Sequence, residues 1–136
     1  MKLYLDDKRI PIHSFEYTKN GIYLEEWNIV KNYEEFVKYI TENEMPEIIS
    51  FDHDIADEHY TPQEYWHDYE GSKAYQESQV YKEKTGYDCA KALVEYCAIN
   101  NISLPNFICH SMNPVGKDNI LNLLNNYKKY ESEKSS

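Results

Sequence analysis

The apolar residues of the chain are concentrated in short segments that have the length of buried strands. Residues 2–5, 47–51 and 106–109 form three such segments, and each stops at a cluster of polar residues. Short apolar runs of this kind are typical of strands that are buried on both faces of a sheet. Residues 21–30 carry β-branched and aromatic residues, and they are compatible with one strand or with one arm of a hairpin.

Apolar positions recur at helical spacing in three other segments, and each follows a pair of residues that favours a helix start. The three pairs are Asn32 with Glu35, Thr85 with Gly86, and Asn113 with Pro114. Asn32 and Glu35 form a capping-box pattern, and proline suits the first turn of a helix. We expect the first helix to end before Pro46 and the second to end at Asn100-Asn101.

Strands and helices thus alternate, which predicts an α/β fold with a mainly parallel sheet of four or five strands and helices on both faces. Three segments fall outside this pattern. We expect residues 8–20 to form a loop, 55–84 to form an inserted segment or lid, and 131–136 to form a disordered tail. The chain is therefore predicted to be one domain, residues 1–130, with an acidic and aromatic insertion.

The charge balance restricts the ligands of this chain. Its 136 residues are enough for one buried core. The 24 acidic and 14 basic residues give a formal net charge of −10, which disfavours binding to duplex DNA. A phosphate-bearing ligand must therefore be held by a local positive group or by a metal ion. No segment approaches the ~20 apolar residues of a membrane-spanning helix, so we expect no membrane partner.

Three cysteines, Cys89, Cys97 and Cys109, lie among apolar residues. Their odd number and wide spacing argue against a disulfide framework and against a zinc ribbon. Asp6 and Asp7 follow the first apolar segment too early for a signal peptide. We therefore expect buried, reduced thiols in a cytoplasmic protein.

Polar residues follow three of the predicted strands, at the edge of a parallel sheet where ligands bind. They are Asp6 and Asp7 after the first strand, Asp52, His53 and Asp54 after the central strand, and His110, Ser111 and Asn113 after the last. Four aspartates in one small volume repel one another unless a cation compensates their charge. A hard divalent cation such as Mg²⁺ (or Mn²⁺) prefers oxygen ligands, so the pattern predicts a metal site. Each aspartate taken alone could instead cap a loop or a helix.

Two histidines belong to these clusters. His110 could act as a general acid or base, because the ordinary pKa of histidine lies near neutrality. His53 is expected to point to the sheet face opposite Asp52, as a catalytic or as a structural residue. A triad of Ser111, His110 and Asp52 is disfavoured, because adjacent side chains on a strand diverge. The chain also has no glycine-rich phosphate loop and no dinucleotide fingerprint.

Four residues are candidates for holding a phosphate group. Arg9, the sole arginine, can bind phosphate oxygens in a bidentate manner, although a solvated surface position also fits it. Ser111 and Asn113 can donate hydrogen bonds, and the helix that follows them offers free N–H groups. Lys117 lies in the first turn of that helix.

The order of these motifs resembles the receiver domain of response regulators. The resemblance implies a three-layer, flavodoxin-like sandwich in which Asp6, Asp7 and Asp52 hold Mg²⁺. It also implies that Asp52 accepts a phosphoryl group and that Ser111 contacts it. Two departures stand out: a loop replaces the receiver helix between the first two strands, and no fifth strand with the usual lysine follows Lys117.

Four motifs are more specifically similar to a divergent branch, the cyclic-phosphate processing receiver domain. They are Leu5-Asp6-Asp7-Lys8-Arg9, Asp52-His53-Asp54, Thr85-Gly86-Tyr87-Asp88 and His110-Ser111-Met112-Asn113-Pro114-Val115-Gly116. The likeness spans residues 2–127, and it implies action on a cyclic phosphate.

We therefore expect a Mg²⁺-dependent phosphoesterase that acts on a cyclic phosphate, either at an RNA 2′,3′-cyclic phosphate end or in a cyclic nucleotide. The expected catalytic residues are Asp52, His110, Asp54 and His53, with Asp54 orienting His53 or joining the metal shell. Tyr60, Tyr65 and Trp66 of the insertion could stack on a base or pack insertion helices. Two alternatives stay open: a signalling receiver that is phosphorylated on Asp52, and a non-catalytic module that binds a nucleotide or a partner.

Overall fold

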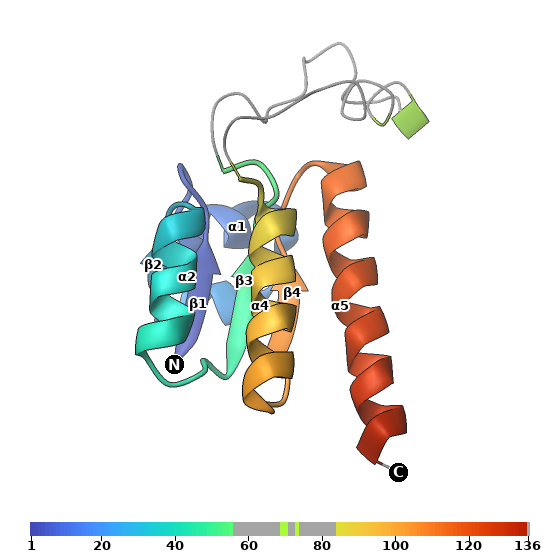
Figure 1. The fold of residues 1–136 in the computed structure, drawn as a ribbon. Coiled ribbons are helices and arrows are strands. Elements are labelled where there is room, and N and C mark those ends of the chain that lie inside the picture. Colours follow the sequence, from blue (N-terminus) through green and yellow to red (C-terminus); the bar gives the residue numbers. More distant parts are fainter. Residues whose placement is uncertain (56–68, 71–72, 74–83, 136) are drawn as a thin grey trace.

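Four parallel strands form the sheet in the computed structural model, which describes residues 1–55, 69–70, 73 and 84–135. The strands are β1 (Lys2–Leu5), β2 (Asn28–Val30), β3 (Ile48–Phe51) and β4 (Asn106–Cys109), in the spatial order β2-β1-β3-β4 (Figure 1). Every neighbouring pair is parallel, with Leu5 opposite Val30 and Leu3 opposite Ile49. This is the flavodoxin-like strand order, in which ligands bind at the carboxyl ends of the first and third strands.

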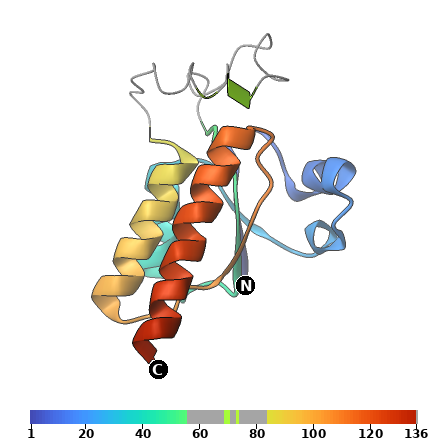
Figure 2. The same ribbon diagram turned by 90° about the vertical axis from the view of Figure 1, so that its right-hand side faces the viewer.

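Helices cover both faces of the sheet. The helices α2 (Tyr33–Glu42), α4 (Gly86–Asn100) and α5 (Pro114–Ser135) pack on one face. The helix α1 (Pro11–Thr18) and the short 3-10 helix η1 (Gly21–Leu24) lie on the opposite face (Figure 2). The predicted parallel α/β sandwich is thereby confirmed.

The sheet face toward α2, α4 and α5 forms the hydrophobic core. Alternate residues of β1 and β3 point into it and are fully buried: Leu3, Leu5, Ile49 and Phe51. They meet apolar side chains from all three helices, among them Phe36, Leu93 and Ile120. Burial of each such side chain contributes roughly 1.5–3 kcal/mol relative to exposure, so this face supplies much of the stability.

The opposite face carries polar and aromatic side chains at the intervening positions of the same strands. Tyr4 and Ser50 alternate with the core residues of β1 and β3, and both are fully buried. The rings of Tyr23 and Trp27 each meet the Tyr4 ring edge to face, with centroids 6.1 Å apart. The two faces of one sheet therefore differ in chemistry, and the candidate site lies on the polar one.

The predicted starts of two helices are confirmed by their caps. Oδ1 of Asn32 accepts a hydrogen bond from the backbone N–H of Glu35 at 2.8 Å, at the start of α2. The Asp88 carboxylate accepts one from the backbone N–H of Thr85 at 2.8 Å and completes a capping box at the start of α4. That helix ends at Asn101, whose positive φ of 54° is the left-handed conformation that asparagine tolerates.

Two expectations for residues 8–30 are corrected by the structure. Residues 8–20 contain the helix α1 and not only loop, so a helix does connect the first two strands. Pro11 opens this helix, but Ser14 is its one buried residue, so α1 has no apolar stripe that periodicity could detect. Within residues 21–30 the chain forms η1 and then the short strand β2, in place of one long strand or hairpin arm.

The last helix continues beyond residue 130. Residues 131–135 are helical, whereas their composition predicted a disordered tail. The Glu131 carboxylate accepts a hydrogen bond from the backbone N–H of Leu104 at 3.1 Å, and the rings of Tyr127 and Tyr130 lie 6.0 Å apart. The hydrogen bond from Leu104 holds the end of α5 against the segment that leads into β4.

Most of the predicted insertion, and with it Tyr60, Tyr65 and Trp66, lies outside the described residues. Ile55, where the insertion was expected to begin, is buried in the core. Cys89 and Cys97 are buried as expected, and all three thiols are free. Within the described part of the chain, none of the helices has the length and apolar character needed to cross a membrane.

Candidate functional site

Asp6, Asp52 and His110 come together beyond the carboxyl ends of three neighbouring strands. Each residue follows the last position of its strand, and the order β1-β3-β4 makes the three ends adjacent. One potential metal-ligating atom from each residue lies within 4.8 Å of the other two. All three residues are only 1% exposed, so any charge on them must be compensated inside the protein.

The Asp6 carboxylate is surrounded by hydrogen-bond donors. The backbone N–H groups of Lys8 and Arg9 each donate to Oδ1 at 2.9 Å, and Nε2 of His110 lies 3.0 Å from Oδ2. Burial by itself would raise the pKa of Asp6, but these hydrogen bonds outweigh it and lower the pKa below its usual value. Asp6 is therefore an ionised carboxylate at neutral pH.

The Asp52 carboxylate is in the opposite situation. Burial, followed by the charge of Asp6, raises the pKa of Asp52 to about 8, although the Arg9 guanidinium opposes the shift. Its Oδ1 accepts the backbone N–H of His53 at 2.9 Å. Its Oδ2 is the one buried polar side-chain atom in the described residues that has no hydrogen-bond partner.

This donor set fits a divalent cation. Two buried carboxylates repel each other, and an orphaned carboxylate oxygen such as Asp52 Oδ2 is costly unless a ligand compensates it. A cation placed among Asp6, Asp52 and His110 would offset both costs. The group can therefore bind a metal, and its atoms do not specify which one.

A hydrogen-bonded chain fixes the state of His110. Nδ1 of His110 lies 2.6 Å from Ser50 Oγ, which lies 2.8 Å from Tyr23 Oη. Burial lowers the pKa of His110 and outweighs the opposing effect of Asp6, and burial also raises the pKa of Tyr23 to about 12. A neutral imidazole beside an ionised Asp6 donates from Nε2 and accepts at Nδ1. Each hydroxyl in the chain then donates toward the carboxylate, from Tyr23 to Ser50 and from Ser50 to His110.

Arg9 places a cation at the rim of this cluster. Its Nη1 lies 3.0 Å from Tyr17 Oη and 3.8 Å from Oδ2 of Asp6. The Tyr17 hydroxyl also donates to the backbone carbonyl of His110, which ties α1 to the end of β4. The Arg9 side chain is 23% exposed, so its remaining donors can reach an anion from solvent.

A second polar group lies on the other side of the same backbone segment. Nδ1 of His53 lies 2.8 Å from Oδ1 of Asp54. The Asn113 side chain donates from Nδ2 to both Asp54 oxygens, at 3.2 and 3.3 Å. Its Oδ1 accepts the backbone N–H of Gly116 at 3.0 Å, which fixes the orientation of the amide. Asn113 therefore holds Asp54, and Asp54 holds His53.

Two glycines of the sequence motifs allow helices to approach this segment closely. A Cβ added at Gly116 would lie 2.3 Å from the His53 ring, so the first turn of α5 rests directly on the imidazole. A Cβ added at Gly86 would lie 1.7 Å from the backbone oxygen of Asp52, and the Gly86 N–H donates to the His53 carbonyl at 2.9 Å. The glycines thus explain why these motifs accompany the Asp52-His53-Asp54 segment.

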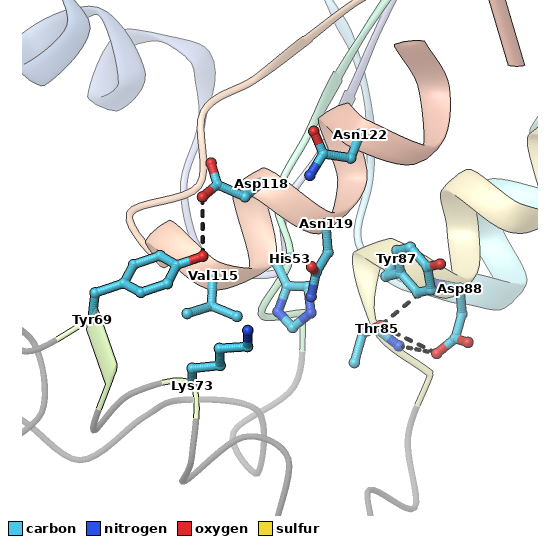
Figure 3. A pocket seen from close by; sticks show the side chains of 10 residues that line it. All are labelled: His53, Tyr69, Lys73, Thr85, Tyr87, Asp88, Val115, Asp118, Asn119 and Asn122. Carbon is cyan, nitrogen blue, oxygen red and sulfur yellow. Dashed lines mark hydrogen bonds between the residues drawn. The ribbon is translucent and has the colours of Figure 1, made fainter. Parts of the chain in front are cut away.

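A cavity of about 450 Å³ opens beside His53. Figure 3 shows His53 among side chains from the start of α4 and from the first turns of α5, with Tyr69 and Lys73 on the far side. His53 is therefore a lining residue of the cavity, and its Nδ1 is held by the Asp54 carboxylate.

The structure divides the predicted site residues into these two groups. As expected, His53 lies against α5 while Asp52 faces Asp6 and His110. Ser111 is buried between the groups, and its Oγ accepts the backbone N–H of Asn113 at 3.1 Å. Asp7 is half-buried outside the three-residue cluster, and Lys117 is exposed. The roles of Asp7 and Lys117 therefore stay predictions.

The residues that support His110 carry no obvious functional motif in the sequence. Ser50 lies inside an apolar run, and Tyr4 lies inside a predicted strand. One signal was present, because both are polar residues at positions that alternate with large aliphatic or aromatic ones. The lining of the cavity by Asp118 and Asn119 was also not predicted.

Comparison with known protein families gives one match. A family model described as the cyclic-phosphate processing receiver domain matches residues 1–126. The matched region contains all four motifs of the sequence, including both glycines discussed above. None of the curated proteins and none of the solved structures that were compared with the chain matches it.

Proposed function

This chain belongs to the family of cyclic-phosphate processing receiver domains, and on that premise we propose that it is a metal-dependent phosphoesterase that hydrolyses a cyclic phosphate. The observation that carries the proposal is the buried group of Asp6, Asp52 and His110, in which one carboxylate oxygen has no hydrogen-bond partner among the residues that the structure describes. The His53–Asp54 pair, whose histidine lines a cavity, adds a means of moving protons.

We propose that the metal is Mg²⁺ or Mn²⁺, held by Asp6 and Asp52 with Asp7 as a further ligand. Carboxylate oxygens suit both ions. When bound, the cation would polarise a phosphoryl oxygen and offset its charge. His110 serves as a positioning residue in this arrangement, because it holds Asp6 through Nε2 and its Nδ1 is occupied by Ser50.

The phosphate group lies over the rim of the cluster in this proposal. Arg9 supplies a partly exposed guanidinium close to Asp6, and Ser111 supplies a hydroxyl between the two polar groups. Lys117 supplies an exposed ammonium group in the first turn of α5. Asn113, which the sequence suggested as a phosphate ligand, is engaged with Asp54 and Gly116, and these contacts favour a positioning role.

His53 is the proposed general base. With Nδ1–H donating to the Asp54 carboxylate, Nε2 carries the free electron pair, and His53 is one of the residues that line the cavity. His110 is less suited to this task, because its side chain is fully buried and both of its nitrogens are hydrogen-bonded.

The proposed reaction adds one water molecule across one ester bond of the cyclic phosphate. Nε2 of His53 accepts a proton from the water as its oxygen forms a bond to phosphorus. The ring P–O bond breaks, and the departing oxygen takes a proton from solvent. His53 then releases its proton to solvent, and the product is a phosphate monoester with a free hydroxyl on the same molecule.

The proposal is tested by incubating the full chain with 2′,3′- and 3′,5′-cyclic nucleotides and either cation, with ³¹P NMR as the readout. We expect one class to give a monoester, and both Asp52→Asn and His53→Gln to abolish the reaction. Glu44→Gln, which changes an exposed acid away from the site, is the matched control and should keep full activity. A rate that is unchanged by Asp52→Asn would exclude this mechanism.

A phospho-accepting receiver is the second candidate, because Asp52 Oδ2 is unpartnered and nucleophilic attack requires a free oxygen. Incubation with a small phosphodonor and Mg²⁺, followed by intact mass spectrometry, separates the two functions. A gain of one phosphoryl group by the unmodified chain but not by Asp52→Asn, without hydrolysis of any cyclic phosphate, would favour the signalling function.

A further inference from the structure

The cavity beside His53 has no role in the proposed reaction beyond bordering the base. At about 450 Å³ it is within the size range of small-molecule sites and exceeds what a phosphate group alone would fill. Residues from the start of α4 and the first turns of α5 line it, together with Tyr69 and Lys73 (Figure 3). The cavity and the carboxylate cluster are linked through consecutive residues, because Asp52 belongs to the cluster and His53 lines the cavity.

The lining is unsuited to a second anion. Asp88 and Asp118 both contribute carboxylates, and Lys73 is the one cationic side chain that the cavity shows among the described residues. A phosphate here would be repelled by the two acids. The anionic end of a ligand therefore belongs at Arg9 and Ser111, and the cavity suits an uncharged group that donates hydrogen bonds.

The lining offers acceptors whose positions are already fixed. One oxygen of Asp88 holds the Thr85 backbone N–H at 2.8 Å, and one oxygen of Asp118 accepts the Tyr69 hydroxyl at 3.2 Å. Among the described residues, the second oxygen of each carboxylate makes no hydrogen bond. The Asn119 amide also has none within that part of the chain, and it can both donate and accept.

Aromatic side chains add planar surfaces to these acceptors. Tyr87, in the first turn of α4, is half-buried and lines the cavity. The Tyr69 ring, 43% exposed, lines it from the other side. Stacking on such rings is how proteins bind unpaired bases, and carboxylate and asparagine side chains are typical readers of base amino groups.

We propose that this cavity binds the nucleoside part of the cyclic phosphate and selects a base that carries an exocyclic amino group. The assignment rests on the proposed function, and it narrows the substrate to a nucleotide or a nucleotide end. An amino group donates to the Asp118 carboxylate, whereas a carbonyl oxygen at the same position places two acceptors face to face. Adenine is therefore favoured over hypoxanthine, and cytosine over uracil.

Adenosine and inosine are the pair for the test, because inosine carries a carbonyl oxygen in place of the 6-amino group and a proton on the neighbouring N1. The metal-free full chain is titrated with each nucleoside, and the side-chain amide of Asn119 is followed by NMR. We expect adenosine to bind on the order of ten-fold more tightly, the usual value of a hydrogen bond to a charged group. Asp118→Asn should remove this preference, whereas Asn126→Ala, an exposed change further along α5, should leave it intact.

Two results would overturn the assignment: equal binding of the two nucleosides, or no response to either at millimolar concentration. The test is independent of turnover, because Asp52→Asn should lose hydrolysis and keep the preference for adenosine. Hydrolysis of adenosine and inosine 2′,3′-cyclic phosphates with equal KM would leave the proposed function standing and exclude the base selection. Selective nucleoside binding without any hydrolysis would support the base selection and exclude the proposed hydrolysis.

Discussion

The ring of Tyr4 lies flat on the imidazole of His110, with centroids 4.3 Å apart and planes inclined by 6°. Hydrogen bonds to Ser50 and Asp6 hold the two ring nitrogens at the same time. Stacking on Tyr4 and hydrogen bonds at both ring nitrogens thus fix the position of His110. Because His110 holds the Asp6 carboxylate, the orientation of that carboxylate depends on Tyr4 and Ser50, which lie behind the proposed metal site.

Removal of the Ser50 hydroxyl should destabilise the protein. Ser50→Ala leaves Nδ1 of His110 and the Tyr23 hydroxyl buried without their shared partner. We expect a loss of about 1–3 kcal/mol in the free energy of unfolding, measured by urea denaturation. Ser103→Ala, at an exposed position, is the control. Equal losses in the two variants would show that the hydrogen-bonded chain contributes nothing.

The contribution of Asp52 to the stability of the metal-free protein should fall as pH rises from about 4 to about 8. The pKa of Asp52 is raised from 3.8 to about 8 by burial and by Asp6, so the folded state binds more protons than the unfolded state across this window. The stability that protonated Asp52 contributes is fully present below pH 3.8, and it is lost as the pH rises through about 8. Because the lowered pKa of His110 has the opposite effect below pH 6.5, the decline is measured as the difference in urea midpoint between the unmodified chain and Asp52→Asn in the presence of a chelator.

Asp52→Asn is the variant that isolates the contribution of the Asp52 carboxyl group. It should flatten the decline of stability with pH, and it should stabilise the metal-free protein at alkaline pH. Glu44→Gln should retain the full decline. Asp6 acts in a separate window, since its lowered pKa gives stability that is lost only as the solution becomes more acidic than pH 3.8. If the urea midpoint of Asp52→Asn declines with pH as steeply as that of the unmodified chain, the pH dependence belongs to another group.

Addition of Mg²⁺ or Mn²⁺ should raise the melting temperature. A cation that binds only the folded state at a hundred-fold excess over its Kd adds about 2.7 kcal/mol. The increase should grow with pH, because the metal competes with a proton for the Asp52 carboxylate. Differential scanning calorimetry of the unmodified chain and of Asp52→Ala measures it. A shift of the same size in Asp52→Ala would place the ion elsewhere.

Gly116→Ala should displace His53 while the fold is retained. The new Cβ would lie 2.3 Å from the ring, and the imidazole must move to accept it. We expect a loss of at least about ten-fold in kcat, because a base moved by about 1 Å no longer meets its proton. Gly21→Ala is the matched control, since its Cβ would meet nothing within 4 Å. Equal activity of the two variants would show that His53 does not take part in the reaction.

The sequence was sufficient to predict the core of this fold. The apolar strand segments and the helix starts at Asn32 and Thr85 signal their structure through neighbouring residues, so they could be read locally. The convergence of Asp6 and Asp52 also followed from the rule that parallel strands present their carboxyl ends together.

The supporting residues could not be predicted in the same way. The contact of Ser50 with His110 joins positions 60 residues apart, and only the strand order places them side by side. The helix α1 was missed because it is held mainly by hydrogen bonds, such as that of Ser14 with Tyr4, and hydrophobic periodicity does not register these. The closeness of Gly116 to His53 likewise depends on how α5 docks.

The attachment of α1 has a consequence for hydrogen exchange. The helix buries only Ser14, and polar contacts made by Tyr17 and Ser14 join it to the sheet, whereas α2, α4 and α5 share a continuous apolar core. Layers held in these two ways differ in their free energy of opening. The α1–η1 layer should form a separate cooperative unit whose amides exchange before those of the other helices. We therefore expect the polar face to open and close again while the apolar core under α2, α4 and α5 stays folded.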